Sequence, residues 1–162
     1  MENIKDIAIQ VIDTEANSIL GLKNLLTDNF AKVVELILKS KGNVVVSGIG
    51  KSANIAQKIV ATLNSTGTTA VFMHAADAIH GDLGIIRDDD IVIIISKSGE
   101  TPEIKVLTPL IKIRKNKLVA IVGNTKSYLA AEADYVLDTT VPHEACPNNL
   151  APTASTTAQL VM

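Results

Sequence analysis

Two short segments rich in glycine and hydroxyl side chains are the residues of this chain best suited to chemistry. The first runs from Ser47 to Ser52 (Ser-Gly-Ile-Gly-Lys-Ser), and the second runs from Ser96 to Thr101 (Ser-Lys-Ser-Gly-Glu-Thr). Each segment follows a run of β-branched residues and precedes a helical pattern. Backbone N–H groups and the positive end of a helix dipole favour an anion at such a turn. The two segments therefore predict a pocket for a phosphate group.

The first segment partly matches two nucleotide-binding motifs. Gly48 to Ala53 matches the dinucleotide pattern G-x-G-x-x-G/A, but the acidic residue expected about 20 positions later is missing, because the second strand ends at His74. A P-loop requires a glycine at position 45, where this chain has valine. Neither cofactor motif is complete.

The residues of the first segment have a simpler interpretation as a tight turn between a strand and a helix. Lys51 argues against it, because a lysine at a helix start opposes the helix dipole unless it faces an anion or a carboxylate. We therefore expect Ser47, Gly48 and Ser52 to bind a ligand beside Lys51.

The second segment offers more hydroxyl groups than a helix cap needs. Thr101 precedes Pro102 and is a reasonable N-cap, but Ser96 and Ser98 add two further hydroxyls beside Gly99. Three hydroxyl groups and a glycine favour a phosphate-binding cradle over a simple cap.

Acidic and imidazole side chains occur near the same strand ends. Glu103 and Glu144 are candidate acid–base groups, although Glu103 is equally consistent with a first-turn acid that complements the helix dipole. His74 and His80 lie six residues apart, which is not the i, i+4 spacing of the helical zinc motif. Glu144 lies in a loop with prolines nearby, where catalytic groups often occur.

Strands and helices alternate through most of the chain, which predicts an α/β fold with a parallel sheet. The carboxyl ends of parallel strands share one edge of the sheet, so the candidate residues should meet there. Gly42 should end the second N-terminal helix, which Asp28 should cap, and Pro109 should kink or end a later helix. The expected strands are 43–47, 68–73, 91–96, 118–122 and 135–139; the expected helices lie within 3–26 and 30–38, at 52–65, 102–115 and 126–132, and from Thr153 onward.

Composition limits the classes of protein to consider. The chain has 162 residues, 47% of them apolar, which is enough for one domain with a core and excludes disorder. A net charge of −2 does not favour nucleic acid as a partner. A single cysteine fits a reducing compartment. The start lacks a signal-peptide pattern, and no apolar run reaches the roughly 18 residues that span a bilayer. We expect one cytoplasmic domain that does not enter the membrane.

Four motifs together resemble the sugar isomerase (SIS) domain, and more narrowly the D-arabinose-5-phosphate isomerases. They are Ser-Gly-Ile-Gly-Lys-Ser, His-Gly-Asp-Leu-Gly, Ser-Lys-Ser-Gly-Glu-Thr-Pro-Glu, and the run from Glu144 to Ala158. The resemblance implies a three-layer sandwich with a five-stranded, flavodoxin-like parallel sheet preceded by helices. It also implies interconversion of D-arabinose 5-phosphate and D-ribulose 5-phosphate, which supplies Kdo synthesis for lipopolysaccharide or capsule.

The same resemblance implies roles for individual residues. The family's catalytic groups fall on Lys51, His80, Glu103 and Glu144, its phosphate-binding hydroxyls fall on Ser96, Ser98 and Thr101, and a histidine that binds inhibitory zinc falls on His74. No cofactor is implied, and family members are typically homotetramers with sites at subunit contacts. Many members carry a CBS pair after this domain and use a further histidine downstream. We therefore expect the C-terminal end of the SIS domain to be truncated here.

An aldose–ketose isomerase needs a base for the carbon acid, an acid–base group for oxygen, and positive charge for the enediolate. We expect Glu144 to be the carbon base, followed in preference by Glu103, with a carboxyl pKa raised toward neutrality. His80 would act on oxygen or open the ring, and Lys51 would stabilise negative charge. A non-catalytic SIS module that binds a phosphosugar, and an isomerase of another phosphosugar, remain alternatives; a scaffold protein is disfavoured.

Overall fold

A computed structural model describes residues 3–162 of the chain. The five strands are β1 (Val44–Gly48), β2 (Ala70–His74), β3 (Ile91–Ser96), β4 (Lys117–Val122) and β5 (Tyr135–Asp138). The helices are α1 (Ile4–Gly21), α2 (Asp28–Lys39), α3 (Lys51–Ser65), α4 (Ala75–Ala78), α5 (Pro102–Arg114), α6 (Tyr128–Glu132) and α7 (Ala154–Val161), with short 3-10 turns η1 (Leu22–Asn24) and η2 (Asp82–Ile85).

All five strands are parallel and lie in the order β2-β1-β3-β4-β5. The chain steps outward from β1 to β2 and then returns to place β3 on the other side of β1. The carboxyl ends of β1 and β3 are therefore neighbours from which the chain departs in opposite directions. Open α/β sheets bind ligands in the crevice at this switch point.

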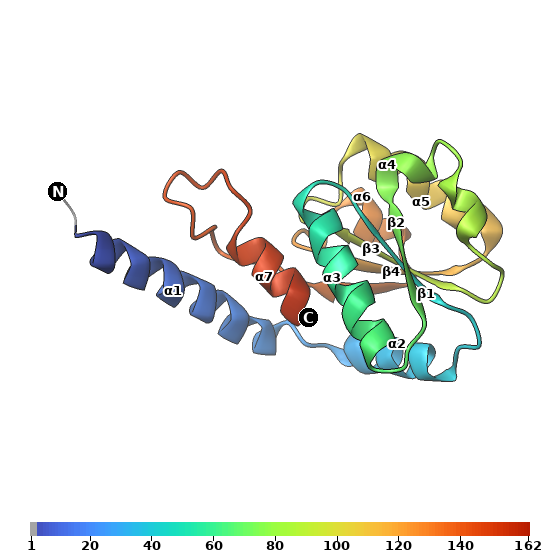
Figure 1. The fold of residues 1–162 in the computed structure, drawn as a ribbon, viewed down its shortest axis with the longest axis horizontal. Helices are drawn as coiled ribbons and strands as arrows, with labels where there is room; N and C mark the ends of the chain where they lie inside the picture. Colours follow the sequence, from blue (N-terminus) through green and yellow to red (C-terminus); the bar gives the residue numbers. More distant parts are fainter. Residues whose placement is uncertain (1–2) are drawn as a thin grey trace.

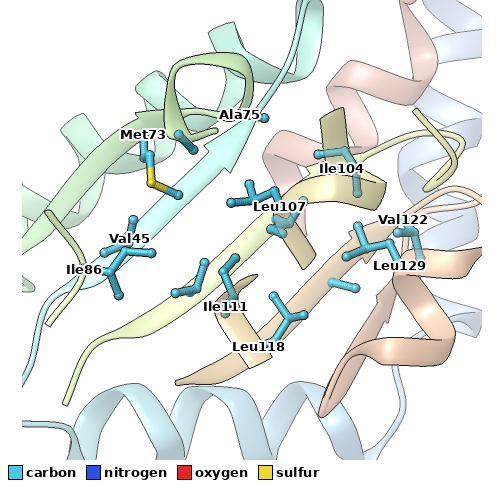
Figure 2. Close-up of a cluster of buried hydrophobic side chains, with 14 of the residues drawn as sticks. Val45, Met73, Ala75, Ile86, Ile104, Leu107, Ile111, Leu118, Val122 and Leu129 are labelled. Atoms are coloured by element: carbon cyan, nitrogen blue, oxygen red, sulfur yellow. The ribbon is translucent and has the colours of Figure 1, made fainter. Parts of the chain in front are cut away.

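Two apolar clusters cover the two faces of the sheet, which makes three layers. Alternate residues of β3 serve opposite faces: Ile91, Ile93 and Ile95 pack toward α2 and α3, and Val92 and Ile94 pack toward the other side. Figure 2 shows the second cluster, in which Ile104, Leu107 and Ile111 of α5 cover the sheet together with Leu129 of α6. The fold class expected from the sequence is confirmed.

Helix α1 extends away from the sheet and packs against α7, the last helix of the chain (Figure 1). Its apolar side chains are largely exposed, including Ile4 at 84% and Ile12 at 65%. Helix α7 lies between α1 and α3, so it packs beside the helix that begins at the end of β1.

Two local expectations are wrong, and a third is narrowed. Thr27, and not Asp28, caps α2, because its Oγ1 accepts a hydrogen bond of 3.3 Å from Asn29 N. Helix α5 continues through Pro109 to Arg114, so Pro109 does not end the helix. The segment after β2 contains α4 and η2 where a loop was expected.

Between residues 3 and 162, no helix combines the length and apolar character that crossing a membrane requires.

Candidate functional site

A cavity of about 270 Å³ lies at the switch point of the sheet. Three parts of the chain line it: the turn after β1, the loop after β3, and the start of α7. The lining residues are Ile49, Lys51, Ser52, Ile95, Ser96, Lys97, Ser98, Thr101, Pro152, Ser155, Thr156 and Gln159. The structure therefore brings the two sequence segments together at one site.

The turn after β1 leaves the N-terminus of α3 open to the cavity. Gly50 occupies the N-cap position with φ of 59°, a conformation that favours glycine, and supplies no side chain to cap the helix. Lys51 is the first residue of α3 and is exposed. Gly48 is buried, and a Cβ there would lie 3.0 Å from the carbonyl carbon of Ser52. The free N–H groups and the Lys51 charge make this turn suitable for an anion.

The loop after β3 is held in shape by its own side chains. Ser96 Oγ accepts a hydrogen bond of 3.0 Å from Gly99 N, and Ser98 Oγ accepts one of 3.2 Å from Glu100 N. Gly99 has φ of +65° and packs against Ser127, so this position accommodates no Cβ. These contacts curl the loop around the N-terminus of α5.

Thr101 is the N-cap residue of α5 by position, but its side chain does not cap the helix. Its Oγ1 is buried and has no hydrogen-bond partner within residues 3–162. Ser47 Oγ, one strand away, is likewise buried and unpartnered in the described chain. A buried hydroxyl without a partner costs free energy unless a ligand or water satisfies it. Thr101 lines the cavity, so its hydroxyl is available to a ligand there, whereas Ser47 is not among the lining residues.

Glu100 has a structural role within the same loop. Its carboxylate accepts a hydrogen bond of 2.6 Å from Tyr128 N at the start of α6 and pairs with Lys105 at 2.7 Å. The Lys105 hydrogen bond is the main cause of a lowered pKa for Glu100. Glu100 therefore stabilises the loop as an ionised acid.

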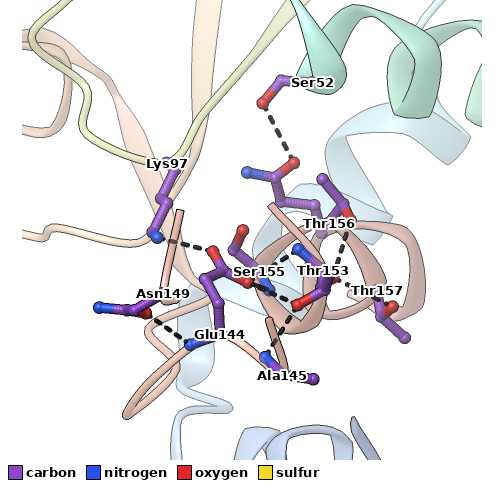
Figure 3. A network of polar contacts seen from close by, with 10 residues as sticks. Ser52, Lys97, Glu144, Ala145, Asn149, Thr153, Ser155, Thr156 and Thr157 are labelled. Carbon is purple, nitrogen blue, oxygen red and sulfur yellow. Dashed lines mark hydrogen bonds and ion pairs between the residues drawn. The ribbon is translucent and has the colours of Figure 1, made fainter. Parts of the chain in front are cut away.

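Glu144 is the most strongly held acid near the cavity. Its Oε1 lies 2.6 Å from Lys97 Nζ, and its Oε2 accepts hydrogen bonds from Thr153 N at 2.8 Å and from Ser155 N at 3.1 Å (Figure 3). Burial raises the pKa of this carboxyl, but the hydrogen bonds from Lys97, Ser155 and Thr153 together outweigh burial and lower the pKa to about 2. The raised pKa expected for a carbon base is therefore wrong for Glu144.

The remaining sequence candidates do not line the cavity. Glu103 lies in the first turn of α5, two residues after Thr101, and is partly exposed. His80 is exposed in the segment between α4 and η2. His74 ends β2 beside Gly48, and its Nδ1 lies 3.7 Å from Asp77 Oδ2. Within the part of the chain that the structure describes, no three His, Cys, Asp or Glu side chains are grouped as a metal site.

Sequence reasoning missed the third wall of the cavity. Ser155, Thr156 and Gln159 of α7 line it, and Lys97 reaches it from the β3 loop. Two signals were available: Lys97 stands between two predicted phosphate ligands, and the run Ala154-Ser-Thr-Thr concentrates hydroxyls at a helix start. No periodicity showed that α7 would return to the end of β1.

Known proteins resemble this chain along nearly its whole length. Arabinose 5-phosphate isomerase KdsD of Pseudomonas aeruginosa is 48% identical over 155 residues, covering 96% of this chain and 48% of the relative. Arabinose 5-phosphate isomerase KpsF of Escherichia coli O6:H1 is 49% identical over 140 residues, covering 86% of this chain and 43% of the relative. The chain thus spans less than half the length of these curated relatives.

A solved structure has the same fold as this chain. A protein of Escherichia coli CFT073 in complex with arabinose 5-phosphate superposes with a TM-score of 0.92 at 37% identity, covering 99% of this chain and 87% of that chain. The sequence pattern of the SIS domain family matches residues 36–162. This range contains the whole sheet, both candidate phosphate-binding loops and α7. The chain therefore belongs to the SIS domain family.

Proposed function

We propose that this chain is the SIS portion of an arabinose 5-phosphate isomerase, which interconverts D-arabinose 5-phosphate and D-ribulose 5-phosphate. The observation that carries the proposal is the cavity at the switch point, where Lys51 and the Thr101 hydroxyl meet the open N-termini of α3 and α5. The names of the curated relatives and the sugar phosphate bound to the solved relative supply the substrate.

The phosphate of the substrate would occupy the end of the cavity between the two helix starts. Ser96, Ser98 and Thr101 offer hydroxyls there, and the helix dipoles of α3 and α5 favour a dianion. Ser47, Gly48 and Ser52 support the same end from the β1 side. Phosphate binding would fix the sugar in place, so that its binding energy contributes to the orientation of C1 and C2.

Isomerisation moves a proton between C1 and C2 through an enediolate. We assign the carbon base to Glu103 in preference to Glu144, because both oxygens of Glu144 are already engaged. Lys51 would stabilise the enediolate charge, and His80 would move protons on oxygen or open the sugar ring. These steps require no redox cofactor, and none is proposed.

We further propose a homotetramer in which a site is completed at subunit contacts. His80 and Glu103 do not line the cavity of a single chain, so a neighbouring subunit is needed to bring them to it. The exposed apolar side chains of α1, such as Ile4 and Ile12, supply a surface for that contact. Light scattering on the purified protein would measure the assembly, and a monomer with full activity would contradict this arrangement.

The setting we propose is Kdo synthesis for lipopolysaccharide or capsule, in the cytoplasm. The test is a coupled assay for ribulose 5-phosphate with arabinose 5-phosphate as substrate, in parallel with unphosphorylated arabinose, and with and without a chelator. We expect turnover of the phosphosugar alone. Turnover that the chelator raises would indicate inhibition by a metal, for which His74 is the proposed ligand. Binding of arabinose 5-phosphate without turnover would instead indicate a regulatory SIS module.

A further inference from the structure

We propose that Glu144 is a positioning residue that acts through Lys97 and the start of α7, and that Lys97 in turn screens the Glu144 charge from the phosphate. This inference rests on the proposed function, because it concerns the same cavity. It assigns Lys97, for which the sequence suggested no role, to the binding site. It also removes Glu144 from the proton-transfer chemistry.

Glu144 has no carboxylate oxygen free for substrate. Its side chain is 1% exposed. Lys97 occupies Oε1, and the backbone and hydroxyl of Thr153 and the backbone of Ser155 occupy Oε2. Its own backbone N donates to Asn149 Oδ1 at 3.0 Å. A carbon base must reach the C–H bond it breaks, and this carboxylate would first have to give up several hydrogen bonds.

Glu144 also fixes the third wall of the cavity, which the start of α7 forms. Thr153 is the N-cap residue of α7 by position, but its side chain does not cap the helix. The Glu144 carboxylate takes over this role from nine residues upstream by accepting from the backbone N–H groups of Thr153 and Ser155. The turns that follow carry Thr156 and Gln159 into the cavity lining. Glu144 therefore determines where α7 meets the substrate.

Glu144 is a buried carboxylate beside a cavity that should attract a dianion, and an unpaired negative charge in a poorly solvated place is strongly felt by its neighbours. The Lys97 ammonium pairs with the Glu144 carboxylate (Figure 3). Lys97 also lines the cavity, so it lies between this carboxylate and the proposed phosphate site. The ion pair cancels the carboxylate charge, so that Lys51 and the two helix starts set the local potential.

The test compares Lys97→Met, Glu144→Gln and the double variant in the arabinose 5-phosphate assay. We expect Lys97→Met to raise KM by about tenfold, because it exposes the phosphate to an unpaired carboxylate. Glu144→Gln should also raise KM, because the glutamine NH2 group must then face either the Lys97 ammonium or the N–H groups at the start of α7. The double variant should recover most of the lost affinity, and kcat should stay within about threefold throughout.

Two results would overturn the proposal. One is a fall in kcat of about 100-fold or more in Glu144→Gln, with KM unchanged and no recovery in the double variant, since that is the signature of a lost general base. The other is additive effects on KM, which would show that the two residues are not coupled. If Lys97→Met fails to fold, the double variant should fold again, and failure of both would equally count against the proposal.

A matched control is present elsewhere in the chain. Lys112 and Glu132 form an ion pair with the same 2.6 Å separation between α5 and α6, outside the cavity lining. Lys112→Met, Glu132→Gln and their double variant should leave KM and kcat within about twofold of the wild type. A change in KM as large as that of Lys97→Met would mean that the assay reports general destabilisation.

A second readout separates this inference from the proposed function. Inorganic phosphate should raise the thermal unfolding midpoint of the wild type by binding the folded protein. Lys97→Met should lose most of that rise, and the double variant should regain it. This pattern without any isomerase activity would support the Lys97–Glu144 pair and reject the proposed reaction. Isomerase activity with an equal rise of the unfolding midpoint by phosphate in all variants would support the proposed reaction and reject the role of the Lys97–Glu144 pair.

Discussion

Ser52 Oγ lies 3.2 Å from Gln159 Oε1 and joins the first turn of α3 to the last helix of the chain. The two residues are 107 positions apart in the sequence, and both line the cavity. Gln159 is 1% exposed, so its amide oxygen depends on this hydrogen bond. The contact fixes the distance between two walls of the site, because Ser52 belongs to the turn after β1 and Gln159 belongs to α7.

Removing one partner of this contact should leave the other buried and unpaired, so the effects of changing the two partners should not add. Ser52→Ala leaves the buried Gln159 amide oxygen unpaired, and we expect a loss of about 1–3 kcal/mol in the free energy of unfolding. Ser52→Ala combined with Gln159→Leu should be less costly than the two single changes summed, because both polar partners are gone. Urea unfolding measures these values. Strict additivity would show that the hydrogen bond contributes little.

Thr101→Ala should separate binding from stability. Because the buried Thr101 hydroxyl caps nothing, its loss should leave the free energy of unfolding unchanged or raise it by up to about 1 kcal/mol. The same change should raise KM for the phosphosugar by about tenfold, because a hydrogen bond to a phosphate is lost.

The control for this prediction is Thr27→Ala. Thr27 Oγ1 does cap a helix, since it accepts from Asn29 N at 3.3 Å. Its removal should cost about 1 kcal/mol of stability and leave KM unchanged. If Thr101→Ala lost as much stability as Thr27→Ala and kept its KM, the Thr101 hydroxyl would be a cap and not a ligand group.

The sheet and two walls of the site could be predicted from the sequence for a simple reason. Buried parallel strands appear as short β-branched runs, and each candidate ligand-binding loop directly follows such a run. Ser47–Ser52 follows β1, and Ser96–Thr101 follows β3. Local pattern thus located both loops, and the general rule for parallel sheets placed them at one edge.

The third wall could not be predicted, because its position depends on contacts between distant segments. The order of the strands, which makes β1 and β3 neighbours, leaves no trace in any local pattern. The same holds for Glu144, whose loop position suggested a catalytic acid–base group. Only the fold shows that Lys97 and the start of α7 surround the carboxylate and lower its pKa to about 2.

Gly99→Ala should disrupt the phosphate loop more than an ordinary glycine replacement. Gly99 has φ of +65°, and a Cβ there would overlap Ser127, whose own Cβ would lie 2.6 Å away. Backbone strain of about 1 kcal/mol is therefore joined by a steric clash that must move α6 or the loop. We expect a loss of stability of about 2 kcal/mol or more and a clear rise in KM.

Gly67→Ala provides the comparison for backbone strain alone. Gly67 has φ of +93°, but a Cβ there would meet nothing within 4 Å. We expect a loss of about 1 kcal/mol with an unchanged KM. Equal losses for the two replacements in thermal unfolding would show that the contact between Gly99 and Ser127 adjusts without cost.

The last prediction concerns acid stability and follows from Glu144. Its pKa is about 2 in the folded chain against 4.5 as the ordinary value. A lowered folded-state pKa stabilises the protein at pH values above 4.5, and this stabilisation disappears as the pH falls from 4.5 toward 2. The wild type should therefore lose up to about 3 kcal/mol more than Glu144→Gln over this range.

Chemical unfolding at a series of pH values measures the difference, with Glu132→Gln as the control for an acid whose ion pair is more exposed. Parallel curves for wild type and Glu144→Gln would mean that the carboxylate is not held by Lys97 and the start of α7 in solution, and the argument for its positioning role would fail with them.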